Sequence, residues 1–112
     1  MKLSDLASAL SLVPVTGEPG DREFAGVYAG DLLSRAMSHV KADNVWITIM
    51  TNKNVVAVAS LADAAAVILA EGTELLPDAL EAARENGVTV YSSDKNVYEL
   101  CCGIDRAQKE AL

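Results

Sequence analysis

This chain of 112 residues is dominated by short apolar runs. The runs alternate with segments in which apolar residues recur at helical spacing. Four runs have the length and composition of buried β-strands, at residues 23–30, 45–50, 64–72 and 88–92. The nearly continuous run 45–50 is typical of a strand that is covered on both faces, as in a parallel sheet. Because helices separate the strands, the crossovers must be right-handed. We predict a three-layer α/β fold in which helices cover both faces of a mostly parallel, four- to five-stranded sheet.

The intervening segments predict five helices, at residues 5–12, 32–40, 54–62, 77–86 and 97–111. The expected N-caps of three of them are Ser4, Asp31 and Asn96. Pro77 suits a first helical turn, and Gly87 is a helix stop. Residues 16–21 have turn chemistry, and residues 13–15 are a candidate edge strand. The sequence has no repeat and no sign of a second domain, so we expect one domain over residues 1–112.

The composition excludes several classes of partner. The formal net charge is −7, and the nine lysines and arginines are scattered, which argues against nucleic acid and against an acidic membrane surface. The longest apolar run is far below the about 20 residues that a membrane span needs. Asp5 interrupts the apolar N-terminal segment, so it makes a poor signal peptide. We therefore expect a cytoplasmic location.

Residues for catalysis or metal binding are sparse. Cys101 and Cys102 are adjacent, which excludes a disulfide framework and lacks the ligand spacing of a zinc site. The one histidine, His39, comes late in a predicted helix, where a charged imidazole is a common stabilising device. No phosphate loop or dinucleotide fingerprint is present. We expect no metal, no cofactor and no enzymatic activity, and we disfavour a phosphoryl-transfer enzyme.

Polar turns follow three of the predicted strands. They are Thr51-Asn52-Lys53-Asn54, Glu71-Gly72-Thr73 and Ser92-Ser93-Asp94-Lys95-Asn96. In open parallel sheets, ligands bind outside the carboxyl ends of the strands, so these turns would line one rim if their strands are neighbours. The first turn opens a helix whose free N–H groups favour an anion, and Lys53 adds a positive charge. The alternative is that Asn52 or Asn54 only caps that helix and that Lys53 is solvated.

A strand, a polar turn and a small-residue helix are followed in this chain by "AAVILAEG" and "LPDALEAARENGVTVYSSDKNVYEL". In this order of segments the chain resembles the DRTGG domain over nearly its whole length. That family includes regulatory modules beside CBS domains and stand-alone proteins, and its fold is related to the N-terminal domain of HPr kinase/phosphorylase. The family's Gly-Asp-Arg corresponds here to Thr51-Asn52-Lys53, and its Thr-Gly-Gly to Ala70-Glu71-Gly72, of which only Gly72 matches. Ser93 and Tyr98 resemble the Thr and Tyr of the family's last turn. The chain contains a separate Gly-Asp-Arg at residues 20–22, but it lies at the start of a different element, and we do not equate it with the family's motif.

Two functions remain open at this point. The first is a non-catalytic, ligand-sensing regulatory module that binds a small anion or a nucleotide at the rim. Its candidate ligand-binding residues are Thr51, Asn52, Lys53, Asn54, Gly72, Ser92, Ser93, Asn96 and Tyr98. The second is a protein–protein adaptor or assembly partner of a larger metabolic enzyme, with no ligand of its own. We also expect a homo-oligomer, with a dimer favoured, through an apolar patch that includes Gly26, Tyr28 and residues 32–37.

Overall fold

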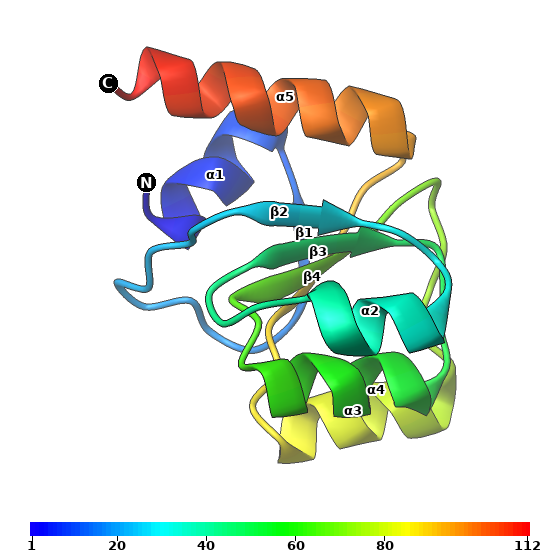
Figure 1. Cartoon of the computed structure of the whole chain (residues 1–112). Helices are drawn as coiled ribbons and strands as arrows, with labels where there is room; N and C mark the ends of the chain where they lie inside the picture. The colour runs from blue at the N-terminus through cyan, green and yellow to red at the C-terminus, as the bar shows by residue number, and fades with distance from the viewer.

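A five-stranded sheet lies between two helical layers in the computed structural model, which describes residues 1–112 (Figure 1). The helices are α1 (Leu3–Leu10), α2 (Leu33–His39), α3 (Lys53–Ala62), α4 (Pro77–Glu85) and α5 (Val97–Glu110). The strands are β1 (Val13–Thr16), β2 (Val27–Ala29), β3 (Val45–Thr48), β4 (Ala66–Leu69) and β5 (Val90–Ser92). The order across the sheet is β1-β5-β4-β3-β2. Strands β2 to β5 are parallel, and β1 joins β5 antiparallel. The predicted fold class is confirmed.

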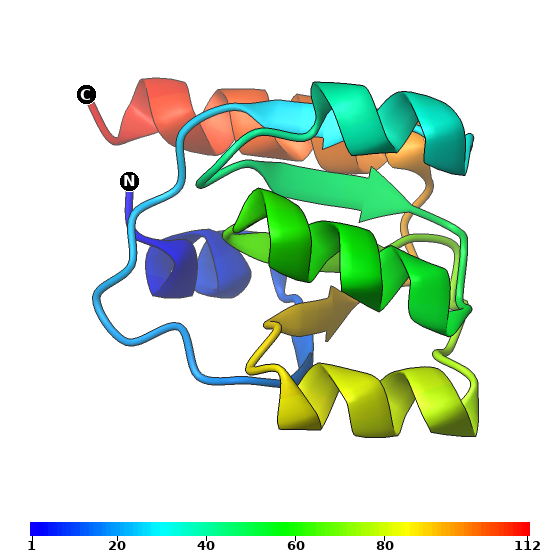
Figure 2. The same cartoon turned by 60° about the horizontal axis from the view of Figure 1, so that its bottom comes forward.

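The two layers differ in the number of helices they hold. Helices α2, α3 and α4 cover one face of the sheet, and α1 and α5 cover the other (Figures 1 and 2). Alternate residues of β3 supply the two cores, because strand side chains point to opposite faces. Val45 and Ile47 join the core beneath α1 and α5, while Trp46 joins the core beneath the other three helices. No helix is both long enough and apolar enough to cross a membrane.

Helix α1 begins earlier than the sequence predicts. Lys2 is at the N-cap, without a side-chain hydrogen bond, and the expected cap Ser4 lies inside the first turn. The reason is a contact that is distant in sequence. Lys2 forms an isolated bridge with Glu23, and the Leu3 N–H donates to the Arg22 carbonyl oxygen at 2.8 Å. The 22–23 backbone therefore satisfies the N–H of the first helical residue, one of the four N-terminal donors that have no partner within the helix.

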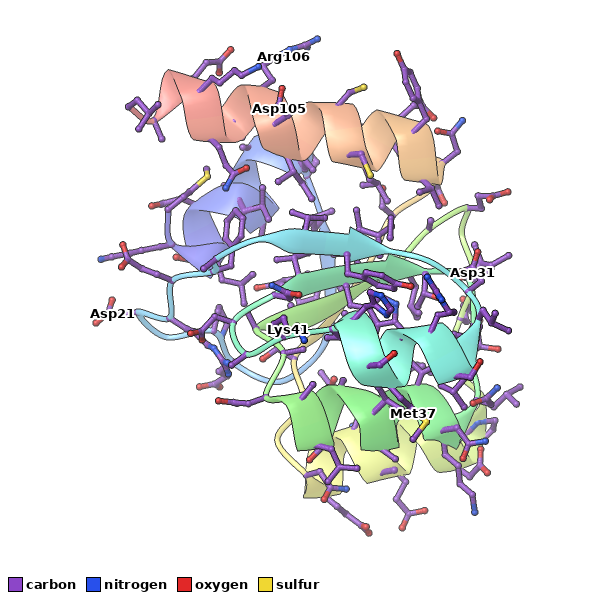
Figure 3. The ribbon with its side chains drawn as sticks, viewed as in Figure 1. Asp21, Asp31, Met37, Lys41, Asp105 and Arg106 are labelled. Atoms are coloured by element: carbon purple, nitrogen blue, oxygen red, sulfur yellow. The ribbon has the colours of Figure 1, made fainter.

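The expected role of Asp31 as the N-cap of α2 is also wrong. Leu32 is at the cap, and no side chain bonds the helix start. Asp31 Oδ1 accepts instead from the Thr48 hydroxyl at 2.7 Å and from the Ile49 N–H at 2.9 Å. Thr48 is fully buried at the end of β3, so its hydroxyl needs a partner inside the protein. Asp31 thus ties the connection after β2 to the carboxyl end of β3 (Figure 3).

Other sequence signals place the elements correctly. Asn96 caps α5 in a reciprocal capping box with Glu99, and Pro77 occupies the first turn of α4. Residues 13–15 do belong to an edge strand. The strands are shorter than their apolar runs, and the differences are largest at β2, which has three residues instead of eight, and at β4, which has four instead of nine. Gly26, with φ of +85°, ends the extended conformation immediately before that strand.

Arg22 holds together the loops at the amino end of the sheet. Its guanidinium donates to Asp43 Oδ1 at 3.0 Å and to the Asp63 carbonyl oxygen at 2.7 Å, and lies 3.2 Å from Asp63 Oδ1. Asp43 and Asp63 precede β3 and β4, and both have left-handed backbones, with φ of 65° and 56°. The Gly-Asp-Arg at residues 20–22 therefore has a structural role at the edge opposite the predicted rim.

Replacing Arg22 with Ala should lower the free energy of unfolding by about 1–2 kcal/mol, because three charge-assisted contacts disappear while solvent screens part of their value. Urea unfolding followed by circular dichroism measures the change. Arg106→Ala is the matched control, since Arg106 is exposed and makes no ion pair. Equal small losses in the two variants would show that Arg22 does not hold these loops.

Candidate functional site

The three polar turns meet at the carboxyl edge of the sheet, as predicted, because β3, β4 and β5 are adjacent and parallel. Backbone hydrogen bonds also join them to one another. The Gly72 N–H donates to the Ser93 carbonyl oxygen at 2.9 Å, and the Glu71 N–H donates to that of Lys95 at 2.9 Å. The Leu76 N–H donates to the Thr51 carbonyl oxygen at 3.0 Å. We call this connected set of turns, residues 49–52, 70–76 and 93–96, the rim.

The turn after β3 mainly organises the start of α3. Asn52 is the N-cap, and its Oδ1 accepts from the Asn54 N–H at 3.0 Å. Thr51 is half-buried, and its carbonyl oxygen is used by Leu76. Lys53 is exposed and makes no ion pair, so its charge is available to a ligand. None of the five principal cavities is lined by these residues.

Gly72 is required by the backbone. Its φ is +69°, a conformation that favours glycine, and a Cβ atom at this position would lie 3.1 Å from Asp94 Oδ1. Glu71 before it also has a positive φ, of 60°. The one residue that matches the namesake motif of the DRTGG family is therefore explained by the tight crossing of two turns.

The turn after β5 holds the other candidate residues. Ser93 Oγ accepts from the Lys95 N–H at 3.1 Å, and Asn96 caps α5, so both side chains already have partners. Tyr98 is 76% exposed on the first turn of α5. The neighbouring Cys102 thiol raises the pKa of the Tyr98 hydroxyl, chiefly through a side-chain hydrogen bond. Ser92 has no such partner and lines two cavities.

These two cavities flank the carboxyl end of β5. The larger, of about 340 Å³, lies between β1 and α4 and is lined in part by Val13, Pro14, Leu69, Thr73, Leu80 and Ser92. The smaller, of about 220 Å³, lies toward α1 and includes Ser92 and Ser93. The larger is at the lower bound of volumes typical for small-molecule sites. Sequence reasoning missed its β1 wall, because the antiparallel pairing of β1 with β5 brings Val13 to the rim.

The position of the larger cavity matches a general feature of open α/β sheets. Helix α4 follows β4 onto one face, and α5 follows β5 onto the other, so the turns after these two parallel strands leave toward opposite faces (Figure 2). Ligands of such sheets bind outside the carboxyl ends of the strands. Here the Gly72–Ser93 and Glu71–Lys95 hydrogen bonds join the turns after β4 and β5 directly to each other. The two cavities beside Ser92 are the spaces that remain open.

The rim is neither strongly basic nor uniformly polar. The lysines at this edge of the sheet, Lys53 and Lys95, are outnumbered by the carboxylates of Asp31, Glu71, Glu74 and Asp94. Five of the exposed large apolar side chains also belong to this edge or to the helix starts beside it: Val13, Leu32, Ile49, Leu76 and Tyr98. This mixture fits a ligand with an apolar surface and hydroxyl groups better than it fits a free phosphate.

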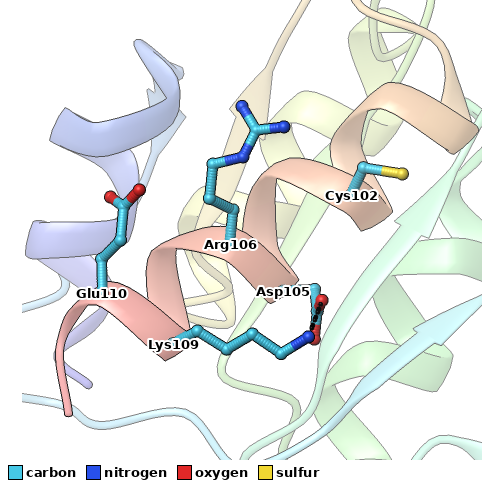
Figure 4. A pocket seen from close by; sticks show the side chains of 5 residues that line it. All are labelled: Cys102, Asp105, Arg106, Lys109 and Glu110. Atoms are coloured by element: carbon cyan, nitrogen blue, oxygen red, sulfur yellow. Dashed lines mark hydrogen bonds and ion pairs between the residues drawn. The ribbon is translucent and has the colours of Figure 1, made fainter.

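A separate hollow of about 460 Å³ runs along the exposed side of α5 (Figure 4). All its lining residues come from that one helix, and Lys109 donates to Asp105 at 2.8 Å, a contact that raises the Lys109 pKa.

Burial raises the pKa of the nearby Cys101 thiol, which keeps it protonated and weakly nucleophilic. His39, the last residue of α2, contacts its own helix through the Arg35 carbonyl oxygen, at 2.8 Å. No cluster of three potential metal ligands occurs.

Comparison with known proteins places the fold. Neither a family model nor a curated protein sequence matches the chain. Among solved structures, the chain is similar to the CBS and DRTGG domains of the regulatory region of Clostridium perfringens pyrophosphatase, solved with its activator diadenosine tetraphosphate. The TM-score is 0.73 at 14% sequence identity, over 95% of this chain and 46% of that one. The chain thus spans less than half of that structure, and the similarity shows a shared fold.

Proposed function

We propose that this protein is a non-catalytic regulatory module that binds a small ligand, of the nucleotide class, at the rim. The observation that carries the proposal is the position of the 340 Å³ cavity, which is lined by Thr73, Glu74 and Leu75 of the second turn and by Ser92 at the start of the third. Backbone hydrogen bonds link these turns to each other and to the turn after β3. The turns lead into helices of both layers, so a ligand that moves them acts on α3, α4 and α5 together.

The chemistry of the rim favours a nucleotide over a simple anion. The apolar side chains of Leu75 and Leu80 line the cavity and offer packing for a base, and the carboxylate of Glu74, in the same lining, can accept hydrogen bonds from ribose hydroxyls. Lys53 and the start of α3 suit a phosphate group. The regulatory region of the Clostridium perfringens pyrophosphatase, part of which shares this fold, was solved in complex with a dinucleotide, and this supports the same ligand class here.

Thermal unfolding with added ligand tests the proposal, because a ligand that binds only the native state raises the unfolding temperature. The probes are ATP, diadenosine tetraphosphate and inorganic phosphate. We expect stabilisation of about 2.7 kcal/mol by a nucleotide at 100 times its Kd, and little effect of phosphate. Lys53→Ala should weaken nucleotide binding about tenfold, the effect of 1.4 kcal/mol. Lys41→Ala, at the amino edge, is the charge-matched control and should bind like the wild type.

Each nucleotide is tested at about 1 mM, a concentration that reveals binding as weak as about −4 kcal/mol. If neither nucleotide raises the unfolding temperature at this concentration, the ligand proposal is contradicted. Equal weakening by Lys53→Ala and Lys41→Ala would place the ligand elsewhere.

The second candidate is the adaptor of a larger metabolic enzyme. The five exposed apolar residues at the carboxyl edge favour it, since such side chains, gathered at one edge, are typical of protein contacts. The variants Leu76→Asp and Tyr98→Asp distinguish the adaptor from the ligand-binding module. Leu61→Asp on α3 is the control. Loss of an enzyme partner in the first two variants, with no nucleotide effect in the wild type, would favour the adaptor.

A further inference from the structure

Strand β2 forms one edge of the sheet, and its outer side is uncovered. In Figure 1 it lies in front, with α5 above it and α2 below it, and no segment crosses its outer edge. Val27 and Ala29 are exposed, and Tyr28 is half-buried. The other edge strand, β1, carries Pro14, which cannot donate a hydrogen bond and is a common way to protect an edge. Strand β2 contains neither a proline nor a charged residue.

The hydrogen bonds to β3 show which groups of β2 are free. The Val45 N–H donates to the Gly26 carbonyl oxygen at 3.0 Å, and the Gly30 N–H donates to that of Ile47 at 3.1 Å. Since backbone groups of a strand alternate between its two edges, Gly26, Tyr28 and Gly30 face β3. The N–H and C=O groups of Val27 and Ala29 therefore point outward, spaced as an added strand requires.

We propose that this edge pairs with β2 of a second copy, antiparallel, about a two-fold axis at Tyr28. In this register Val27 faces Ala29 of the partner subunit, and each such pair exchanges two backbone hydrogen bonds. Tyr28 faces the partner subunit's Tyr28 as a non-hydrogen-bonded pair. The two sheets then form one continuous sheet, in which the same residues of both copies meet, as a closed two-fold interface demands.

Charge and shape support a second copy as the occupant. Residues 24–30 contain no charged side chain, so the paired strands bring no like charges face to face although each chain carries −7. The one charged residue in the lining of the hollow beside the strand, Asp105, pairs with Lys109 at 2.8 Å. The Tyr28 ring lies back over Gly30, where a Cβ atom would be 3.0 Å from it, and stacks 6.1 Å from the His39 ring. The ring therefore leaves the outer edge clear. On the opposite face, a 350 Å³ hollow beside Val27, Ala29 and Ile104 leaves room for partner side chains.

The oligomeric state and its response to one edge residue test the proposal. We expect the wild type to be a dimer by light scattering at about 100 µM and Ala29→Lys to raise the Kd at least tenfold, or about 1.4 kcal/mol. Leu61→Lys adds the same charge at a side chain that is 87% exposed on α3 and should dimerise like the wild type. Circular dichroism checks that each variant is folded. A wild type that is monomeric up to about 1 mM, or equal effects of both lysines, would overturn the proposal.

Cross-linking tests the register. In a Cys101→Ser/Cys102→Ser background, Tyr28→Cys places its own copies opposite each other with Cα atoms about 4.5 Å apart, within disulfide range. Val27→Cys is the control, because position 27 faces position 29, and its own copy is diagonal at about 7–8 Å. Mild oxidation should give a covalent dimer of the first variant at least ten times faster. Equal rates, or faster cross-linking of Val27→Cys, would overturn the Tyr28 axis.

Discussion

Trp46→Ala is expected to lower the free energy of unfolding by about 3–5 kcal/mol, the usual result of removing a fully buried large aromatic side chain. Trp46 is fully buried beneath α2 and α3, and its Nε1–H donates to the Gly30 carbonyl oxygen at 3.1 Å. Its loss removes both apolar burial and the donor that holds the end of β2. Since domains of this size are stable by about 5–15 kcal/mol, the change is a large share of the total.

Trp46→Phe separates these two contributions. It keeps most of the buried volume but leaves the Gly30 carbonyl oxygen without its donor, so we expect a loss of about 1–3 kcal/mol. Trp46 is the one tryptophan of the chain, so urea unfolding of both variants must be followed by circular dichroism instead of fluorescence. A loss below about 1 kcal/mol for Trp46→Ala would mean that the core collapses around the vacant space, contrary to the packing described here.

Asp31→Ala is expected to cost about 2–3 kcal/mol, because it leaves the buried Thr48 hydroxyl and the Ile49 N–H without a charged acceptor. Asp31→Asn is the matched control: its side-chain oxygen can still accept both bonds, so we expect less than half of that loss. Urea unfolding gives the free energies, and amide hydrogen exchange at Ile49 should rise in the Ala variant alone. Similar losses in the two variants would show that charge, and not the acceptor position, matters at Asp31.

The alternation of apolar runs with helical spacing was sufficient to predict the fold, because each signal lies within a few residues of the element it specifies. The capping box of α5 joins Asn96 to Glu99, and Pro77 acts on its own helix. The two wrong caps have partners that are distant in sequence. Leu3 bonds residue 22, and Asp31 bonds residues 48 and 49, so local preference for Ser4 or Asp31 as caps could not reveal either contact.

The candidate site was predictable in part for the same reason. Adjacent parallel strands must bring their following turns to one edge, so the rim followed from the order of elements on the condition that β3, β4 and β5 are neighbours, as the structure shows. The cavity beside Ser92 did not, since its wall depends on which strand β1 joins and in which direction. The binding role of residues 51–54 stays a prediction, and Asn52 has a cap function that its sequence position already suggested.

The pairing of β1 with β5, and of α1 with α5, has a consequence for how the chain is made. The first sixteen residues hold two elements whose main partners are the last strand and the last helix. During synthesis, the apolar face of Leu3, Leu6 and Leu10 stays uncovered until α5 has left the ribosome, whereas β2 to α4 can assemble from neighbours in sequence. Chaperone contact during biosynthesis should therefore concentrate on α1, which is made before the other elements of this domain but completes its packing only with the last of them.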